Sequence, residues 1–203
     1  MNECSKSIYR RLSNPNFIIN YFRGKGLDVG AGTDPLSNYI YLFPAIDSIR
    51  LWDVKDGDAE ILETIPDNSY DFIHSSHCLE HLNNPLTGLF NWIRVIKPTG
   101  YLIVTVPDED LYEQGQFPST WSNEHKWTFT IFKKNSWSSK SISLINFFSL
   151  LDEEFRNRNV GYTFQIEKIE ILNYTYDRNK VRSDQTLTSL ITESCIEFIL
   201  QKV

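Results

Sequence analysis

The sequence predicts an α/β fold, a parallel sheet with helices on both faces, and three observations support this. Short apolar runs alternate with helical patterns between residues 26 and 106, which is the order of strand-helix-strand units. The first apolar run ends in glycine, as expected for a tight turn after a strand. The chain has 203 residues, 41% of them hydrophobic, which suits one globular domain with a sizeable core.

The expected elements follow in chain order. A helix over residues 7–22 is interrupted near Asn14-Pro15, because proline breaks helices. Strands are expected at residues 26–30, 49–54, 70–75 and 101–106, and further helices at residues 38–44 and 84–96. Asn84 is the expected N-cap of the last of these helices, and Pro85 its first residue.

The end of the chain departs from this alternation. Residues 141–155 are expected to form a helix, whereas residues 162–174 and 195–203 are expected to form strands. Two late strands with no helix between them predict an antiparallel pair at one edge of the sheet.

Composition excludes several classes of protein. With 26 acids against 20 bases the net charge is −6, which disfavours a broad nucleic-acid-binding face. The longest apolar run, residues 39–43, is far shorter than the roughly 20 residues that cross a bilayer, and no apolar segment resembles a signal peptide. The three cysteines are widely spaced and fit neither a disulfide framework nor a zinc cluster. We therefore expect a cytoplasmic protein with no membrane span and no nucleic-acid partner.

A cofactor site is expected where the first strand ends. Residues 28–32, Asp-Val-Gly-Ala-Gly, precede a turn, and their glycines allow the backbone to approach a ligand closely. Asp53 ends the next strand, 21 residues after Gly32, where an acid can accept two hydrogen bonds from a ribose diol. Ligands of open α/β sheets bind beyond the carboxyl ends of the strands, so both features would meet at one site.

Two cofactors compete for this site. NAD sites carry a third glycine, whereas this chain has Asp34 and Pro35 in that stretch. Asp34 would repel a diphosphate but would attract the ammonium group of an amino acid. The sequence thus favours S-adenosylmethionine, whose tail is a zwitterion, over the nicotinamide cofactor of an oxidoreductase.

These motifs resemble those of class I S-adenosylmethionine-dependent methyltransferases of the type 11 kind. Residues 28–32 resemble motif I, Asp53 matches the ribose-binding acid, and Asp58-Ala59 matches the pair that flanks the adenine. Residues 67–73, 75–82 and 94–100 are similar to further segments of that family. The cofactor contacts that the resemblance implies are Asp28, Gly30, Ala31, Gly32, Asp34, Asp53, Asp58, Ala59, Ser75 and Ser76.

The resemblance also implies an architecture. That family has a Rossmann-like sheet of seven strands in the order 3-2-1-4-5-7-6, with strand 7 antiparallel and helices on both faces. One methyltransferase domain would take up residues 1–203, with an N-terminal helical segment at residues 1–24 and an acceptor lid or loop at residues 108–140.

Two segments, residues 107–115 and 123–129, are similar to a bacterial subgroup of the family that is linked to surface-polysaccharide gene clusters. This similarity implies methyl transfer to an oxygen of a small acceptor in polysaccharide or capsule biosynthesis. The acceptor would be a sugar, a nucleotide-linked sugar, or a phosphoryl or phosphoramidate group. A non-catalytic S-adenosylmethionine-binding partner of another enzyme stays an alternative.

The histidines are the candidates for chemistry, because an acceptor hydroxyl needs a base that works near neutral pH. His125 is the first candidate, followed by His81 and His77. His77, Glu80 and His81 are spaced i, i+3 and i+4, so a helical turn would project them to one face. They could brace the loop, supply the base, or bind a divalent metal together with His125; the metal is not favoured, although some metal-dependent O-methyltransferases resemble the chain there. His74 is expected to be structural.

Residues 108–130 follow the strand expected at residues 101–106, which is strand 5 in the numbering of the family. This segment is too long for an ordinary connection, so we expect a functional lid. Its aromatic, acidic and basic side chains would suit a sugar or nucleotide acceptor. The expected acceptor contacts are Tyr112, Glu113, Trp121, Lys126 and Trp127. For the tryptophans, a small core over the sheet edge is the favoured alternative.

Overall fold

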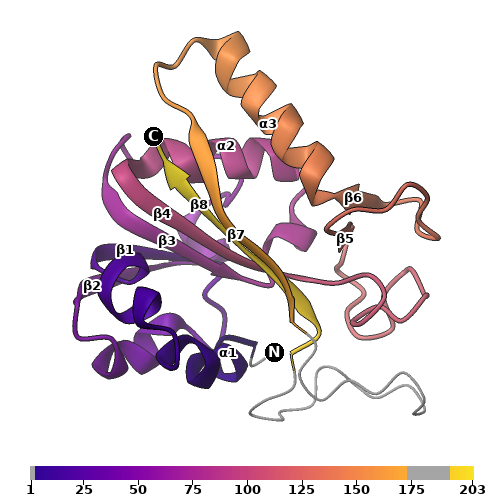
Figure 1. Ribbon diagram of the computed structural model, residues 1–203, viewed down its shortest axis with the longest axis horizontal. Helices are drawn as coiled ribbons and strands as arrows, with labels where there is room; N and C mark the ends of the chain where they lie inside the picture. Colours follow the sequence, from indigo (N-terminus) through magenta and orange to yellow (C-terminus); the bar gives the residue numbers. More distant parts are fainter. Residues whose placement is uncertain (1–2, 173–192) are drawn as a thin grey trace.

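The computed structural model describes residues 3–172 and 193–203, and its centre is a six-stranded sheet. The order of the strands is β2-β1-β3-β4-β8-β7 (Figure 1). The strands are β1 (Gly24–Val29), β2 (Ile46–Trp52), β3 (Tyr70–Ser76), β4 (Ile96–Pro107), β7 (Phe164–Leu172) and β8 (Cys195–Lys202). The first four in chain order pair in parallel, and β8 runs antiparallel to both of its neighbours.

Helices cover both faces of this sheet (Figure 1). On one face lie α1 (Glu3–Leu12), the π-helical turn η1 (Phe17–Tyr21) and the 3₁₀ helix η2 (Leu36–Leu42), which pack over an aromatic core centred on Phe22 and Phe72. On the other face lie α2 (Pro85–Val95) and α3 (Leu144–Arg158), which bury a larger apolar cluster against β4 and β8.

The expected seven-stranded sheet is wrong in one respect. Among the residues that the structure describes, no strand pairs with the outer edge of β2, where strand 3 of the order 3-2-1-4-5-7-6 would stand. The other strands keep their places, and the antiparallel strand is confirmed. Residues 53–69 form the 3₁₀ turn η3 (Val54–Asp56) and further turns instead. The physical reason is local, because this stretch is rich in acids and lacks the period-two alternation of a half-buried strand.

Most other elements are confirmed. The break at Asn14-Pro15 separates α1 from η1, and Asn84 caps α2 by accepting a hydrogen bond from the backbone N–H of Thr87. The helix expected at residues 141–155 begins only at Leu144, because residues 141–143 form β6 (Ser141–Ser143), which pairs with β5 (Thr128–Thr130). The strand expected at residues 162–174 ends at Leu172, and residues 173 and 174 lie outside the described residues.

Across residues 3–172 and 193–203, no helix has both the length and the apolar character that a membrane crossing requires.

Candidate functional site

A glycine turn follows β1 at the carboxyl edge of the sheet. Gly30 and Gly32 have left-handed backbones, with φ of 73° and 53°. A Cβ added to Gly30 would lie 2.5 Å from the Cβ of Cys78, whereas one added to Gly32 would meet no atom closer than 3.8 Å. Gly30 thus allows close packing within the protein, and Gly32 leaves open space beside a ligand.

Asp53 is fixed beside this turn. Its Oδ2 accepts a hydrogen bond from the backbone N–H of Gly32 at 3.1 Å, and its Oδ1 accepts one from Val54 at 2.8 Å. Its own N–H donates to Asp56 Oδ2 at 3.0 Å, which completes a capping box at η3. Each carboxylate oxygen keeps a further acceptor position, as a ribose diol requires.

A cleft of about 380 Å³ opens at this edge of the sheet. Its walls include Asp28 and residues 30–34 from the first turn, Asp53 from the second, and Ser76 from the end of β3. An adjoining cavity of about 410 Å³ shares Gly30 and Asp53 and is lined by Asp58 and Ala59. Of the expected cofactor contacts, only Ser75 turns away from both cavities; it is fully buried, and its hydroxyl donates to the carbonyl oxygen of Val29 at 3.0 Å.

Two further acids of the cleft, Asp28 and Asp34, are held by hydrogen bonds within the protein. Asp28 Oδ2 accepts from the backbone N–H of Leu36 at 2.7 Å, and its Oδ1 lies 2.6 Å from His74 Nδ1. Asp34 accepts from the N–H of Ser5 at 2.8 Å and from the Tyr39 hydroxyl at 2.6 Å. Burial and the contact with Asp34 raise the pKa of Tyr39 to about 12, so this hydroxyl stays a donor.

Histidines and carboxylates form a cluster beyond β3, at the 3₁₀ turn η4 (Leu79–His81). The Oε1 atom of Glu80 lies 3.4 Å from His77 Nδ1, 3.8 Å from His125 Nε2 and 3.9 Å from His81 Nε2. Glu113 accepts a hydrogen bond from His125 Nδ1 at 2.7 Å. The structure therefore brings together His77, Glu80, His81 and His125, the candidate bases and metal ligands. It adds Glu113, which was expected as an acceptor contact and instead binds His125.

The hydrogen bonds of His81 and His125 leave the Nε2 lone pair of each ring directed toward Glu80. His125 donates through Nδ1 to Glu113, and His81 donates through Nδ1 to the carbonyl oxygen of Glu124 at 3.2 Å. In a neutral imidazole the other nitrogen is then an acceptor. Both Nε2 atoms therefore face the same oxygen of Glu80.

Burial makes this cluster unusual. Glu80 and His125 are at most 5% exposed, and the side-chain nitrogens or oxygens of His77 and Glu80 and the Nε2 of His125 have no hydrogen-bond partner within the described protein. Burial alone would raise the pKa of Glu80, but the neighbouring histidines outweigh it and lower that pKa. Burial alone would lower the pKa of His77, but Glu3 and Glu80 outweigh it and raise that pKa. Such unpaired buried atoms are costly and need a reason.

A metal ion fits this donor set. The ligand atoms of Glu80, His81 and His125 lie within 4.8 Å of one another. Imidazole and carboxylate ligands suit Zn, Mn or Fe better than Mg. Glu113 occupies the place of the carboxylate that commonly orients a metal-binding histidine.

The three candidate bases differ in their access to the cleft. His77 and His81 line it, and the His81 side chain is 27% exposed. His125 lies behind His81, with ring centroids 4.9 Å apart and no exposed side-chain surface. Because His125 does not line the cleft, a proton from the acceptor would reach it through a neighbour such as His81 or through a bound ion.

The expected acceptor contacts occupy three environments. Tyr112 is buried, and its ring centroid lies 5.4 Å from that of His77 and 5.6 Å from that of His125. Trp121 is half-buried and donates to the carbonyl oxygen of Tyr112 at 2.8 Å. Lys126 is exposed and donates at 2.7 Å to Asn83, which lines the adjoining cavity.

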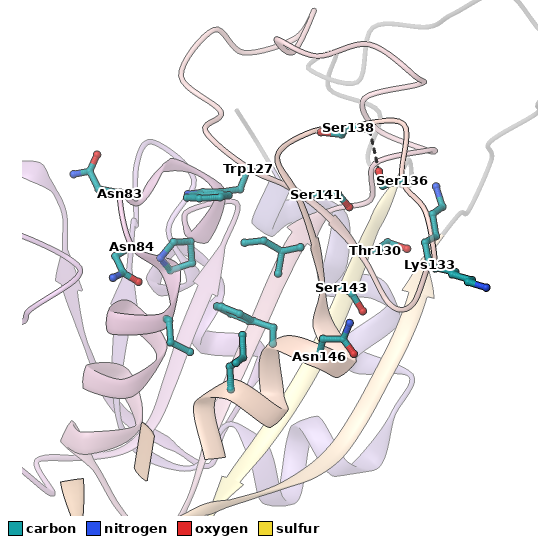
Figure 2. A pocket seen from close by; sticks show the side chains of 16 residues that line it. Asn83, Asn84, Trp127, Thr130, Lys133, Ser136, Ser138, Ser141, Ser143 and Asn146 are labelled. Carbon is teal, nitrogen blue, oxygen red and sulfur yellow. Dashed lines mark hydrogen bonds between the residues drawn. The ribbon is translucent and has the colours of Figure 1, made fainter. Parts of the chain in front are cut away.

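Trp127 belongs to a second pocket, of about 720 Å³, which Figure 2 shows in close-up. This pocket lies between the start of α2, the start of α3 and the segment from residue 127 to residue 143. Its wall is rich in serine and asparagine; in one of its contacts Ser138 N–H donates to Ser136 Oγ at 2.9 Å. Trp127 donates to the carbonyl oxygen of Leu82 at 2.9 Å, and the Nζ of Lys140 lies 5.3 Å from its ring centroid.

Some residues of the cleft were not expected from the sequence. Glu3 and Cys4 reach it from α1, and Ser122 and Glu124 reach it from the loop after β4. Nothing in the sequence around residues 3 and 4 signals a ligand contact, because only the packing of α1 brings them there. The pairing of Asp28 with His74 depends on the parallel register of β1 and β3, which places these two residues side by side and which the sequence alone does not give.

The comparisons with known proteins agree with this geometry. A family described as a methyltransferase domain matches residues 7–160. No curated protein matches the chain. The fold is similar to that of an S-adenosylmethionine-dependent methyltransferase from Archaeoglobus fulgidus, at 17% identity and a TM-score of 0.60, over 100% of this chain and 95% of that one.

Two other solved structures have the same fold. A putative S-adenosylmethionine-dependent methyltransferase from Listeria monocytogenes shares 12% identity over 100% of both chains, with a TM-score of 0.58. The YcgJ protein from Bacillus subtilis shares 14% identity over 96% of this chain and 97% of that one, with a TM-score of 0.54. The family match covers most of the chain and its glycine turn, so the chain belongs to the methyltransferase-domain family, and its cofactor is S-adenosylmethionine.

Proposed function

We propose that this protein transfers the methyl group of S-adenosylmethionine to an oxygen of a small acceptor. The observation that carries the proposal is the histidine-carboxylate cluster of His77, Glu80, His81, Glu113 and His125 beside the cofactor cleft. A sulfonium is already an activated methyl donor, so the protein has to align the acceptor and remove its proton.

The cofactor is divided between the two cavities. Asp53 would accept hydrogen bonds from the ribose hydroxyls, and Asp58 with Ala59 would border the adenine in the adjoining cavity. Asp28 and Asp34 face the methionine end, where their negative charge attracts the ammonium group. The sulfonium would then be held toward the end of β3, near Ser76 and the histidine cluster.

His81 and His125 together form the proposed base. His81 lines the cleft, and His125 stands behind it with its Nδ1–H held by Glu113. Glu113 fixes the ring and stabilises the imidazolium that forms when the proton arrives, which is the role of a carboxylate behind a catalytic histidine. Tyr112 covers the rings of His77 and His125 and helps to exclude water from the reacting groups.

A divalent metal is the second version of the same chemistry, and the unpaired buried atoms of Glu80 and His125 favour it. Glu80, His81 and His125 would hold the ion, with His77 as a further ligand. A bound ion would supply Lewis-acid polarisation of the acceptor oxygen.

The biological context that we propose is surface-polysaccharide biosynthesis. Its support is that the two segments similar to the polysaccharide-associated subgroup meet at the site, where Glu113 from the first contacts His125 from the second. Sugars, nucleotide-linked sugars and phosphoryl or phosphoramidate groups are the candidate acceptors.

The test is a methylation assay on a panel of nucleotide-linked and free sugars, read by mass spectrometry as the gain of one CH₂ in mass. His125→Ala should bind S-adenosylmethionine as the wild type does and lose most turnover. His81→Ala, at a residue that lines both cavities, should also lose most turnover. Asn123→Ala changes an exposed residue of the same segment and is the matched control. Unchanged turnover in both histidine variants would remove the proposed base.

Metal content separates the two versions. The metal version predicts about one bound Zn, Mn or Fe ion per chain by elemental analysis, lost in Glu80→Gln and in His81→Ala, and activity abolished by chelation and restored by that ion. A metal-free protein with full turnover would leave the histidine base alone. Tight binding of S-adenosylmethionine with no turnover on any acceptor would support the non-catalytic partner.

A further inference from the structure

A buried line of side chains runs from the N-terminal helix to the cofactor turn. Arg11 Nη1 lies 2.9 Å from His74 Nε2, His74 Nδ1 lies 2.6 Å from Asp28 Oδ1, and Asp28 Oδ2 accepts the N–H of Leu36 at 2.7 Å. Arg11, His74 and Asp28 are 0%, 1% and 2% exposed. The line thus connects α1, β3, β1 and the segment that closes the turn after Gly32.

The hydrogen atoms in this line can be assigned from chemistry. A guanidinium group only donates, so His74 Nε2 must be the acceptor of the contact with Arg11. The single N–H of the neutral ring is therefore on Nδ1, and it donates to Asp28. Arg11 fixes the tautomer, and the tautomer gives Asp28 its donor.

Arg11 is itself held in place. Its Nη2 lies 3.0 Å from Glu197 Oε2, and its guanidinium lies 5.4 Å from the ring centroid of Phe17 and 5.5 Å from that of Phe22. Arg10 binds the same carboxylate at 2.8 Å. Arg11 therefore cannot turn away from His74 without leaving a buried Glu197 oxygen without this partner.

The contact between His74 and Asp28 lies at the wall of the cofactor cleft. Asp28 and His74 pair in register on adjacent parallel strands and both line the cleft. With one oxygen bound to the turn and the other to His74, the Asp28 carboxylate has one orientation. A carboxylate held in this way meets the methionine ammonium without first having to reorient.

We propose that His74 is a positioning residue for S-adenosylmethionine, which acts by donating from Nδ1 to Asp28, with Arg11 setting its tautomer. The proposal rests on the role of Asp28 at the methionine end of the cofactor. A purely structural histidine would only fill space and brace the sheet, whereas here the affinity for the cofactor depends on one nitrogen of the ring.

Two substitutions separate the nitrogens. The amide of His74→Asn stands where Nδ1 stood and can still donate to Asp28, but it does not reach Arg11. The amide of His74→Gln stands where Nε2 stood and can still accept from Arg11, but it leaves Asp28 without its donor. This hydrogen bond lies within the protein, so its loss affects binding through the orientation of Asp28. Ordering one side chain on binding costs up to about 1.5 kcal/mol, which is roughly tenfold in affinity.

The experiment is a titration of each variant with S-adenosylmethionine by calorimetry, below the thermal unfolding temperature of each. We expect His74→Asn to bind within about twofold of the wild type and His74→Gln to bind roughly tenfold more weakly. A merely structural role predicts the reverse order or none, since glutamine is closer to histidine in size. Equal affinities, or weaker binding by His74→Asn, would overturn the proposal.

A second readout needs no variant. In ¹⁵N-histidine-labelled protein, the ring nitrogens of His74 should show the Nδ1–H tautomer; an Nε2–H ring or an imidazolium would overturn the assignment. Neither measurement uses an acceptor or turnover. A wild type that binds the cofactor but methylates nothing would therefore refute the proposed function and leave this test intact.

Discussion

The two glycines of the cofactor turn, Gly30 and Gly32, should respond differently to alanine. Gly30→Ala should mainly reduce the stability of the fold, and Gly32→Ala should mainly weaken cofactor binding. Both residues have left-handed backbones, with φ of 73° at Gly30 and 53° at Gly32. An alanine in such a conformation costs roughly 1–2 kcal/mol. Gly30→Ala and Gly32→Ala share this cost, so they form a matched pair.

The surroundings of the added methyl group differ. At Gly30 it would lie 2.5 Å from Cys78 Cβ and 2.6 Å from its Sγ, and forcing extra volume into a packed site adds roughly 1–3 kcal/mol. The total for Gly30→Ala is then about 2–5 kcal/mol. At Gly32 the nearest atom is the Gly30 carbonyl oxygen at 3.8 Å, so only the backbone cost applies. The methyl group instead occupies cleft space that the cofactor needs.

The assays are urea denaturation for the free energy of unfolding and calorimetry for cofactor affinity. Gly32→Ala should stay within about 2 kcal/mol of the wild type in stability and bind S-adenosylmethionine at least about tenfold more weakly. Gly30→Ala should be the less stable of the two. Wild-type affinity in Gly32→Ala, or equal stability in both variants, would refute this assignment of the cleft.

Three more predictions concern single carboxylates. Asp53→Asn should weaken S-adenosylmethionine binding roughly 10- to 100-fold by calorimetry, since it removes charge from the ribose acceptor, whereas Asp56→Asn, which loses only the cap on Asp53, should change it a few-fold. Arg11 and Arg10 overcome burial and hold the pKa of Glu197 at about 2, against 4.5 normally; this lowered pKa stabilises the fold by about 3 kcal/mol above pH 4.5, a contribution lost as the pH falls toward 2. Glu197→Gln should therefore flatten the acid limb of a urea-denaturation series. Burial raises the pKa of Asp108 to about 6, against 3.8 normally, so ionising it costs the wild type about 3 kcal/mol as the pH rises through this range. Asp108→Asn should stabilise the protein above pH 6 and have no effect below pH 4; a gain at pH 4 would contradict the reasoning.

Local patterns were sufficient to predict the parts of the site that one turn of chain determines. The glycines at residues 30 and 32, Asp53 at the end of β2, and the cap at Asn84 all depend on neighbours within a few residues. The spacing of His77, Glu80 and His81 places them on one short turn for the same reason. Periodicity likewise located every strand of the main sheet within a few residues.

Contacts between distant segments could not be predicted in this way. Glu113 and His125 meet because the loop after β4 folds back on itself, and Arg11 reaches His74 because α1 packs over the sheet. The expected strand beyond β2 failed because an edge strand has one neighbour only, and residues 53–69 have too few apolar side chains to add another.

The two buried polar systems differ in a way that bears on function. Around Arg11, His74 and Glu197 each buried side chain has a partner at 2.6–3.2 Å, which is the condition under which buried charge is tolerated. In the other system Glu80 Oε1 lies 3.8 Å from His125 Nε2 and 3.9 Å from His81 Nε2, and buried atoms of Glu80 and His125 lack hydrogen-bond partners within the described protein.

A gap of that size is too long for a hydrogen bond. Two ligands of one metal ion at about 2.1 Å each can stand up to about 4.2 Å apart, so the gap fits a shared ion, and it equally leaves His81 room to receive an acceptor proton. Both uses require a third species in the cluster. We therefore propose that the satisfied network holds the cofactor end of the cleft rigid, and that the acceptor is activated at the unsatisfied one.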